Sequence, residues 1–335
     1  MRVITVAEAG EFGLVDRVIA RLQLPPGAGA PADAGPVESA PAAGTGLVEL
    51  GPGDDAAVLS TPDGRVVAST DLLVDGRHFR RDWSTGYDVG RKAAAQNLAD
   101  IAAMGARPTG LLLGIASPGD LPAAWVEQLA DGFRDEAASV GAAVLGGDVV
   151  GSDVLMLAVS VFGDLAGRAP VTRSGAKPGD VVAYTGRLGW AAAGLAVLGR
   201  GFRSPVSVVT AHRRPTPPYD EGPRAADLGA SAMVDISDGL VADLTHVALA
   251  SEVGIELDTG RLELPDKLRD VGTALGADPM QWVLAGGDDH ALAATFPGGT
   301  ELPPEWRLIG RVARGRGVLV DGAPYEPPAG WDHFR

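Results

Sequence analysis

Short apolar runs alternate with helical patterns along most of this chain, and this alternation limits the folds that are open to it. The runs that predict strands lie at 56–59, 66–74, 109–116, 142–145, 154–162, 181–185, 232–236, 254–257, 290–296 and 306–312. The patterns that predict helices lie at 11–24, 87–104, 121–140, 188–198, 222–228 and 240–251. Strands that alternate with helices indicate an α/β fold.

The length of 335 residues predicts two domains, because a domain usually holds about 100 to 200 residues. Gly, Arg and turn-forming residues are frequent at 163–179, so we place the boundary there, with an N-terminal domain at 1–163 and a C-terminal domain at 164–335. The stretch 25–46 consists almost entirely of Pro, Ala, Gly and small polar residues. It cannot bury enough apolar surface to offset its ordering entropy, and we expect a mobile insertion.

Composition excludes several classes of function. A net charge of -15 argues against a nucleic-acid partner, which is usually bound through basic patches. The absence of cysteine excludes disulfides, thiolate nucleophiles and Cys-ligated zinc. Apolar stretches such as 154–162 are far shorter than the roughly 20 residues of a membrane-spanning helix, and Glu8 and Glu11 interrupt any signal peptide. We therefore expect a soluble, cytoplasmic protein without a membrane partner.

Six acidic motifs stand near the ends of these predicted elements. They are Gly-Asp-Asp at 53–55, Ser-Thr-Asp at 69–71, Asn-Leu-Ala-Asp at 97–100, Gly-Gly-Asp at 146–148, Asp-Ile-Ser-Asp-Gly at 235–239 and Gly-Gly-Asp-Asp at 286–289. A fold that brings them together creates a pocket of carboxylates, which repel one another unless cations fill it. Hard oxygen ligands suit magnesium, which often bridges substrate phosphates. The motifs together predict magnesium-dependent phosphate chemistry.

Each motif alone also fits an ordinary structural role. Gly-Asp-Asp and Gly-Gly-Asp are common turns, and Ser-Thr-Asp or Asp238 can cap a helix. Asn97 lies three residues before Asp100, and Gln96 four before it, so the three share a face of the predicted helix at 87–104. That face is either solvated or directed into a site. Only the combination of motifs favours the functional interpretation.

The sequence contains no nucleotide-binding loop of the common kinds. Its lysines stand at 92, 177 and 267, and none of them ends a glycine loop. If ATP is used, its phosphates must be held through metal ions and arginine. Arg173, in the turn-rich segment 173–180, offers a guanidinium fork, although that segment also fits a surface linker. His78 and Trp331 are further candidates, for which a surface histidine and an anchor of the C-terminal tail are the plain alternatives.

Taken in order, these motifs resemble the thiamine-monophosphate kinase family, part of the superfamily that includes aminoimidazole ribonucleotide synthetase and selenophosphate synthetase. The matching segments are 53–57, 69–71 with 78–79, 92 with 97–106, 173–180, 235–240 and 331–334. The resemblance implies a two-domain, synthetase-like architecture of α/β type with mixed sheets. It also implies a homodimer in which the N-terminal sheets of two subunits form a shared barrel beside C-terminal α/β domains.

The resemblance further implies roles for individual residues. Several magnesium ions would be held by Asp55, Ser69, Thr70, Asp71, Asp100, Asp148, Asp235 and Asp238. ATP would be contacted by Gly147, Asp148, Arg173 and Ser237. Thiamine monophosphate would be contacted by His78, Asp288 and Trp331.

The chemistry implied is ATP-dependent phosphorylation of thiamine monophosphate to thiamine diphosphate, by direct in-line transfer without a phosphoenzyme. The acceptor phosphate is already anionic, so no residue is assigned as a general base. The difficulty is to bring two anions together, which metal ions achieve by neutralising and aligning them.

Two departures from the family pattern are visible, and two other functions stay open. The segment 25–46 is an insertion, and Gly-Gly-Glu-Asp-Tyr-Glu of the family is replaced here by Gly-Gly-Asp-Asp-His-Ala at 286–291, which shortens the carboxylate at Asp288. The alternatives are another ATP-dependent synthetase of the superfamily and a noncatalytic nucleotide-binding or metal-binding protein. The absence of cysteine disfavours selenophosphate synthetase.

Overall fold

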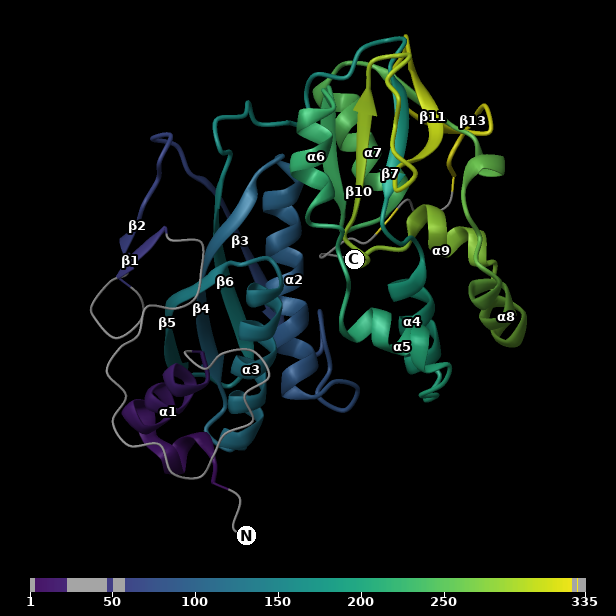
Figure 1. The fold of residues 1–335 in the computed structure, drawn as a ribbon. Coiled ribbons are helices and arrows are strands. Elements are labelled where there is room, and N and C mark those ends of the chain that lie inside the picture. Colours follow the sequence, from purple (N-terminus) through teal and green to yellow (C-terminus); the bar gives the residue numbers. More distant parts are fainter. Residues whose placement is uncertain (1–3, 23–46, 51–57, 327–329, 331–335) are drawn as a thin grey trace. The chain divides into compact units, whose positions relative to one another are not determined.

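The structure is a computed structural model that describes residues 4–22, 47–50, 58–326 and 330 (Figure 1). The predicted insertion at 25–46, the motif with Asp55 and the tail with Trp331 lie outside these residues. The chain divides into two compact units. The N-terminal unit comprises Met1–Ile101 and Pro108–Ala166, and the C-terminal unit comprises Ala102–Arg107 and Gly167–Arg335.

The N-terminal unit contains a four-stranded mixed sheet with the order β3-β6-β4-β5. Its strands are β3 (Val67–Val74), β4 (Arg107–Ser117), β5 (Ala143–Gly151) and β6 (Met156–Asp164). Strands β3 and β6 are antiparallel and β4 and β5 are parallel. A separate antiparallel pair is formed by β1 (Val48–Leu50) and β2 (Val58–Leu59). The helices are α1 (Val6–Leu22), α2 (Gly86–Ala103) and α3 (Ala123–Ser139).

Helices α2 and α3 pack closely because glycines remove side chains from their interface. A Cβ atom added at Gly90 of α2 would lie 2.0 Å from the carbonyl oxygen of Leu129, and one added at Gly132 of α3 would lie 2.1 Å from that of Tyr87. Helix α1 begins earlier than the predicted 11–24 and is kinked at Gly10, whose φ of 70° only glycine adopts readily. The described part of the helix reaches Leu22, and the last two residues of the predicted range lie outside the described residues.

The sheet of the N-terminal unit has two different faces. Along β3, Ser69 and Asp71 point to one face, and Ala68, Thr70 and Leu72 point to the other, because successive side chains alternate. Leu72 is paired with Ala158 of β6, so both lie on the second face. Leu72 is 55% exposed, which leaves an apolar side chain accessible on that face.

The C-terminal unit is built on a seven-stranded sheet with the order β13-β12-β9-β11-β7-β10-β8. Its strands are β7 (Val181–Thr185), β8 (Ala232–Ile236), β9 (Gly254–Leu257), β10 (Ala291–Phe296), β11 (Arg307–Ala313), β12 (Gly317–Val320) and β13 (Ala323–Pro324). Neighbouring strands are antiparallel except for β12 and β9, which are parallel. The mixed sheets agree with the predicted fold class.

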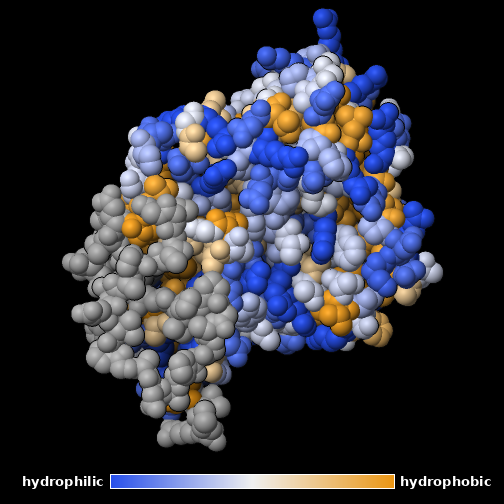
Figure 2. All heavy atoms as spheres, in the orientation of Figure 1, coloured by the Kyte–Doolittle hydropathy of each residue, from blue (hydrophilic) through white to orange (hydrophobic). Residues whose placement is uncertain are grey.

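Six α-helices accompany this sheet in the described part of the C-terminal unit. They are α4 (Trp190–Gly199), α5 (Val206–Arg213), α6 (Glu221–Asp227), α7 (Leu240–Ala250), α8 (Asp266–Leu275) and α9 (Pro279–Ala285), with a 3-10 turn η1 at Thr259–Arg261. The sequence patterns predicted α4, α6 and α7 but missed α5, α8 and α9. Hydrophilic residues cover most of the visible surface of this unit, with hydrophobic residues in small groups between them (Figure 2).

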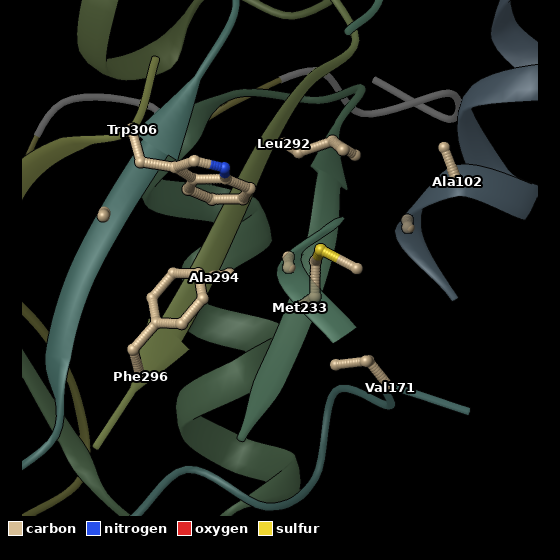
Figure 3. Close-up of a cluster of buried hydrophobic side chains, with 10 residues drawn as sticks. Ala102, Val171, Met233, Leu292, Ala294, Phe296 and Trp306 are labelled. Carbon is tan, nitrogen blue, oxygen red and sulfur yellow. The ribbon is translucent and has the colours of Figure 1, made fainter. Parts of the chain in front are cut away.

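A cluster of buried side chains on β8, β10 and neighbouring segments forms a core of the C-terminal unit (Figure 3). The rings of Phe296 and Trp306 meet edge to face, with centroids 5.1 Å apart. The indole nitrogen of Trp306 donates a hydrogen bond to Glu221 at 2.7 Å. Ala102 and Ala103, the last residues of α2, are buried in the same cluster. No helix among the described residues is long and apolar enough to cross a membrane.

Candidate functional site

Strand β3 and helix α2 bring predicted metal ligands together in the N-terminal unit. Ser69 donates a hydrogen bond from Oγ to Oδ2 of Asp100, at 2.7 Å. One turn earlier on α2, Gln96 donates from Nε2 to Oδ2 of Asp71, at 2.9 Å. The predicted polar face of the helix therefore lies against β3, where one carboxylate from the helix, Asp100, and one from the strand, Asp71, are each oriented by a neutral side chain.

Two neighbouring residues do not join this group. The hydroxyl of Thr70 points to the opposite face of the sheet and donates to the carbonyl oxygen of Val159, at 2.8 Å. Asn97 is fully buried and donates from Nδ2 to the carbonyl oxygen of Ala93 in its own helix, at 2.9 Å. Gln96, rather than Asn97, shares the functional face with Asp100, because residues four apart lie almost above one another on a helix.

The Gly-Gly-Asp motif at 146–148 is a strand with a bulge and not the predicted turn. It lies inside β5, where the register with β4 shifts between Leu111 and Leu112. Gly146 has φ 153°, and a Cβ atom at Gly147 would lie 1.9 Å from the carbonyl oxygen of Leu113. A bulge re-aims the side chains that follow it, which leaves Asp148 exposed.

His78 lies in the loop after β3, and its tautomer follows from one contact. The backbone N–H of Val74 donates to Nδ1 of His78 at 3.0 Å. In the neutral imidazole the proton is therefore on Nε2. The same loop borders an open hollow of about 500 Å³ that is lined by Asp75, Gly76, Arg80, Arg81 and Asp82.

In the C-terminal unit, two of the predicted motifs are held side by side by backbone hydrogen bonds. The N–H of Asp288 donates to the carbonyl oxygen of Ser237 at 2.8 Å, and the N–H of His290 donates to that of Ile236 at 3.0 Å. Gly287 makes the approach possible, because a Cβ atom there would lie 2.1 Å from the oxygen of Ser237. The chain segments 235–239 and 286–290 thus form one structural element.

Asp235 is a buried residue of β8, and its carboxylate faces a histidine. Oδ2 of Asp235 lies 3.1 Å from Nδ1 of His290, and both side chains are 6% exposed. A carboxylate accepts but does not donate when ionised, so Nδ1 of His290 carries the proton in this contact. The opposite nitrogen of His290 lies 3.8 Å from Oδ1 of Asp288.

Asp243 fixes the turn that carries Ser237 and Asp238. Its Oδ2 accepts the backbone N–H groups of Asp238 at 3.1 Å and Gly239 at 3.0 Å. Burial raises the pKa of Asp243 to about 7, against the opposing effect of its hydrogen bond with Gly239, and the charges of Asp235 and Asp238 raise it further. The side chain lies in the first turn of α7, so this turn is anchored to a helix.

Asp289 has a structural role that sequence reasoning did not assign. Its Oδ1 accepts the backbone N–H of Ala191 at 2.9 Å, near the start of α4. Burial raises the pKa of Asp289 to about 7, although the hydrogen bond with Ala191 opposes the rise. The second aspartate of Gly-Gly-Asp-Asp therefore joins the motif to α4.

The segment with Arg173 is held by a serine at the other end of α7. Ser251 accepts the N–H groups of Gly175 and Ala176, each at 3.1 Å, and donates to the carbonyl oxygen of Arg173 at 3.0 Å. Arg173 itself is exposed. Helix α7 therefore begins at the Ser-Asp-Gly turn and ends at the support of the predicted ATP contact.

The predicted site residues thus fall into two groups. The described N-terminal unit holds Ser69, Thr70, Asp71, His78, Asp100, Gly147 and Asp148. The C-terminal unit holds Arg173, Asp235, Ser237, Asp238 and Asp288. Among the described residues, no three acidic or histidine side chains lie close enough to hold a metal ion. Sequence reasoning missed Asp243 and Ser251, because neither belongs to one of the six motifs. Ser251 is far from Arg173 in the sequence, whereas Asp243 lies only four residues after Gly239.

Comparison with known proteins defines the class first. The N-terminal domain of AIR synthase related proteins matches residues 53–165, and the C-terminal domain of the same proteins matches 177–320. This two-domain architecture is that of the AIR synthase related proteins.

Individual relatives then narrow the class. The thiamine-monophosphate kinase of Mycobacterium tuberculosis (strain ATCC 25618 / H37Rv) is 48% identical over 332 residues, which cover 98% of this chain and 93% of that protein. That of Corynebacterium glutamicum is 40% identical and covers 84% of this chain and 88% of its own length. The structure of AaThiL complexed with AMPPCP and TMP superimposes with a TM-score of 0.77 and 32% identity, and covers 100% of this chain and 99% of that one. The chain belongs to the thiamine-monophosphate kinase family.

Proposed function

We propose that this protein transfers the γ-phosphoryl group of ATP to thiamine monophosphate and forms thiamine diphosphate. One observation carries the proposal: the likeness to a thiamine-monophosphate kinase at 48% identity extends over 98% of the chain. A structure that matches the whole chain holds AMPPCP and TMP, an ATP analogue and the expected acceptor. The relatives thus support both substrates.

The oxygen ligands of the two units suit magnesium ions. In the N-terminal unit, Gln96 orients the carboxylate of Asp71, and Ser69 orients that of Asp100. Both donors are neutral, so these two hydrogen bonds do not compensate the negative charge of the carboxylates. Hard, anionic oxygens of this kind are the ligands that magnesium prefers. We infer that Asp71 and Asp100 hold magnesium together with Ser69, Asp55, Asp148, Asp235 and Asp238. When bound, magnesium would neutralise phosphate charge in the transition state.

The remaining residues bind and orient the substrates in this proposal. Arg173 would contact phosphate as a bidentate guanidinium, with its backbone carbonyl fixed by Ser251. Ser237 and Gly147 would contact ATP through exposed strand and turn positions. His78 would donate from Nε2 to thiamine monophosphate, since Nδ1 already accepts a hydrogen bond. No general base is needed, because the acceptor phosphate is ionised at neutral pH.

We further propose a homodimer formed through the second face of the N-terminal sheet. That face presents Leu72, which is 55% exposed, beside the half-buried Ala158 and near the half-buried Phe162 of β6. An apolar sheet face of this kind favours burial against another apolar surface. Leu72→Glu should shift the protein toward monomer in sedimentation analysis. A monomeric wild-type protein would refute the proposal.

The kinase activity is tested by incubating the purified protein with magnesium, ATP and thiamine monophosphate and measuring thiamine diphosphate and ADP. Equal amounts of both products are expected. Folded protein that binds ATP but forms no thiamine diphosphate would refute the assignment and favour a noncatalytic nucleotide-binding role.

The metal role of Asp100 is tested with Asp100→Asn, which keeps the shape of the side chain and removes its charge. The variant should need more magnesium for half-maximal rate. Asp153→Asn, at an exposed position of the same unit, is the matched control and should behave as wild type. An unchanged magnesium requirement in Asp100→Asn would contradict the proposed ligand.

A further inference from the structure

Two buried histidines flank the carboxylate of Asp288 in the C-terminal unit. Oδ1 of Asp288 lies 3.8 Å from Nε2 of His290, and Oδ2 lies 3.5 Å from Nδ1 of His212. His290 in turn faces Asp235 through its other nitrogen, at 3.1 Å. Acidic and imidazole groups therefore alternate in a series of contacts, in the order Asp235, His290, Asp288 and His212. We call this set the acid–histidine chain.

Three members of the acid–histidine chain are buried, and one is accessible. Asp235, His290 and His212 have side chains that are 6%, 6% and 9% exposed, whereas that of Asp288 is 32% exposed. His212 lies on α5, which packs against α4 at Gly194, where a Cβ atom would lie 2.8 Å from Cβ of His212. Buried groups thus support a single carboxylate that reaches the surface.

The backbone around Asp288 also departs from ordinary geometry. Asp288 has φ 71° and His290 has φ 52°, in the left-handed region that few residues other than glycine adopt. Such conformations persist only where the surrounding structure enforces them, and they concentrate at functional sites. Here the hydrogen bonds from Asp288 to Ser237 and from His290 to Ile236 enforce them. The backbone is therefore held in an unfavourable conformation that fixes the direction of the Asp288 side chain.

A carboxylate held in this way suits a cation and not a phosphate. It would repel the phosphates of ATP and thiamine monophosphate, and it would attract the positively charged thiazolium ring of thiamine monophosphate. An aspartate is one methylene shorter than the glutamate of the family pattern, so its direction matters more for contact with a ligand. At 3.8 and 3.5 Å, the rings of His290 and His212 are in contact with the two carboxylate oxygens without hydrogen-bonding them, so they restrict the rotamers of Asp288 by packing and prepare it for binding.

We propose that His212 and His290 are positioning residues that orient Asp288 toward the thiazolium ring of thiamine monophosphate. The inference rests on the proposed function, since it takes that compound as the substrate. It assigns specificity for the organic part of the acceptor to the acid–histidine chain, and it gives the replacement of tyrosine by His290 a role. His212 contacts Asp288 from helix α5, which contains none of the six motifs.

Three substitutions separate the contacts to Asp288 from the rest of the structure. His290→Asn keeps a donor toward Asp235 and tolerates the left-handed backbone, but it cannot reach Asp288. His212→Leu removes the polar contact to Oδ2, whereas His212→Asn keeps a polar group close to the place of Nδ1. His246→Asn, at an exposed histidine of α7, is the matched control.

Steady-state kinetics with each substrate varied in turn test the inference. We expect the KM for thiamine monophosphate to rise about fivefold to tenfold in His290→Asn and in His212→Leu, with the KM for ATP unchanged. His212→Asn should recover most of the loss, and His246→Asn should match wild type. A purely structural role would instead lower the melting temperature and alter both KM values together, which would overturn the inference.

The outcome can be distinguished from a failure of the proposed function. If the wild-type protein forms no thiamine diphosphate, the function is refuted, and calorimetric binding of thiamine monophosphate then tests the acid–histidine chain alone. The chain predicts weaker binding in His290→Asn and His212→Leu than in His246→Asn. Equal affinities, or no binding by the wild-type protein, would overturn it.

Discussion

Asp289 makes the stability of this protein depend on pH in a direction that can be measured. Its carboxyl group is buried, and its pKa rises from the ordinary 3.8 to about 7, chiefly because burial disfavours the ionised form. The charge of Asp288 raises the pKa further, and the hydrogen bonds from Ala191 and Gly189 oppose the rise. The unfolded chain therefore loses this proton near pH 4, while the folded protein keeps it until about pH 7.

Because the folded state binds the proton more tightly, stability falls as pH rises through this interval. Each pH unit costs about 1.4 kcal/mol, so the wild-type protein should lose on the order of 3 kcal/mol between about pH 5 and pH 7 through Asp289 alone. Above the folded pKa the contribution is constant. Asp289→Asn keeps an oxygen for the N–H of Ala191 and does not titrate. The variant should therefore gain stability relative to wild type by that amount.

The assay is urea unfolding of both proteins at about pH 5, 6, 7 and 8, with the difference in free energy of unfolding compared across pH. Asp321→Asn is the control, because hydrogen bonds from Thr259 lower the pKa of Asp321, which is exposed and ionised throughout this range. The difference between Asp321→Asn and wild type should be independent of pH. Parallel curves for Asp289→Asn and wild type would refute the assignment of a neutral, buried Asp289.

Three other substitutions test how the fold supports the site. Gly90→Ala places a methyl group 2.0 Å from a carbonyl oxygen of α3 and should lower the free energy of unfolding by about 1 to 3 kcal/mol. In the control Gly199→Ala, the new methyl group meets nothing within 4 Å, and the free energy of unfolding should change little. Urea unfolding measures both variants. Ser251→Ala frees two N–H groups of the Arg173 loop and should raise the KM for ATP about fivefold in steady-state kinetics. Asp243→Ala leaves two backbone N–H groups without an acceptor and should cost about 2 kcal/mol, while Asp243→Asn retains an acceptor and should cost less; thermal unfolding separates the two.

These expectations have distinct points of failure. Equal unfolding curves for Gly90→Ala and Gly199→Ala would show that α2 and α3 can separate without cost. An unchanged KM for ATP in Ser251→Ala would contradict a role of the Arg173 loop in nucleotide binding. Equal melting temperatures for the two Asp243 variants would show that the hydrogen bonds to the Ser-Asp-Gly turn are dispensable.

Much of the architecture could be predicted from local patterns. The strand 181–185 and the strand 232–236 occur as predicted, because each is a compact apolar run with turn residues around it. Helix α5 was missed, since Val206–Arg213 is short and rich in β-branched residues, and its position depends on packing against α4. The strand β5 was predicted to end at 145, but it continues to Gly151. The register shift leaves Leu145 without a partner on β4, and Gly146 and Gly147 then pair with Leu112 and Leu113 inside the strand.

The motif residues of the candidate site could be predicted from the sequence, but most of the residues that hold them in place could not. Ser69 and Asp100 are 31 positions apart and meet in the structure, whereas the adjacent Thr70 points to the other face of the sheet. This difference can be predicted only if the whole motif 69–71 is known to lie within one strand, because side chains alternate between the two faces. Asp243 and Ser251 hold backbone groups of the motifs from positions that no motif contains. The contact of Ser251 spans 78 positions, so a single sequence carries little sign of it. Asp243, four residues after Gly239 in the first turn of α7, makes a local contact of the kind that a short polar side chain often makes, and it could have been predicted.

Helix α2 begins in one unit and ends in the other, which changes how the protein can be divided. Ala102 and Ala103 are buried with Val171 and Phe296, although Asp100 belongs with β3. A chain ended at 166 would retain these two alanines but lose the partners that shield them from water. Conversely, a fragment that started at 167 would lack the segment whose backbone Gly222 approaches within 2.0 Å. Neither half is therefore a natural module for separate expression. Replacing one half by that of another protein should succeed only if the new half also fits helix α2, because α2 contributes residues to both units.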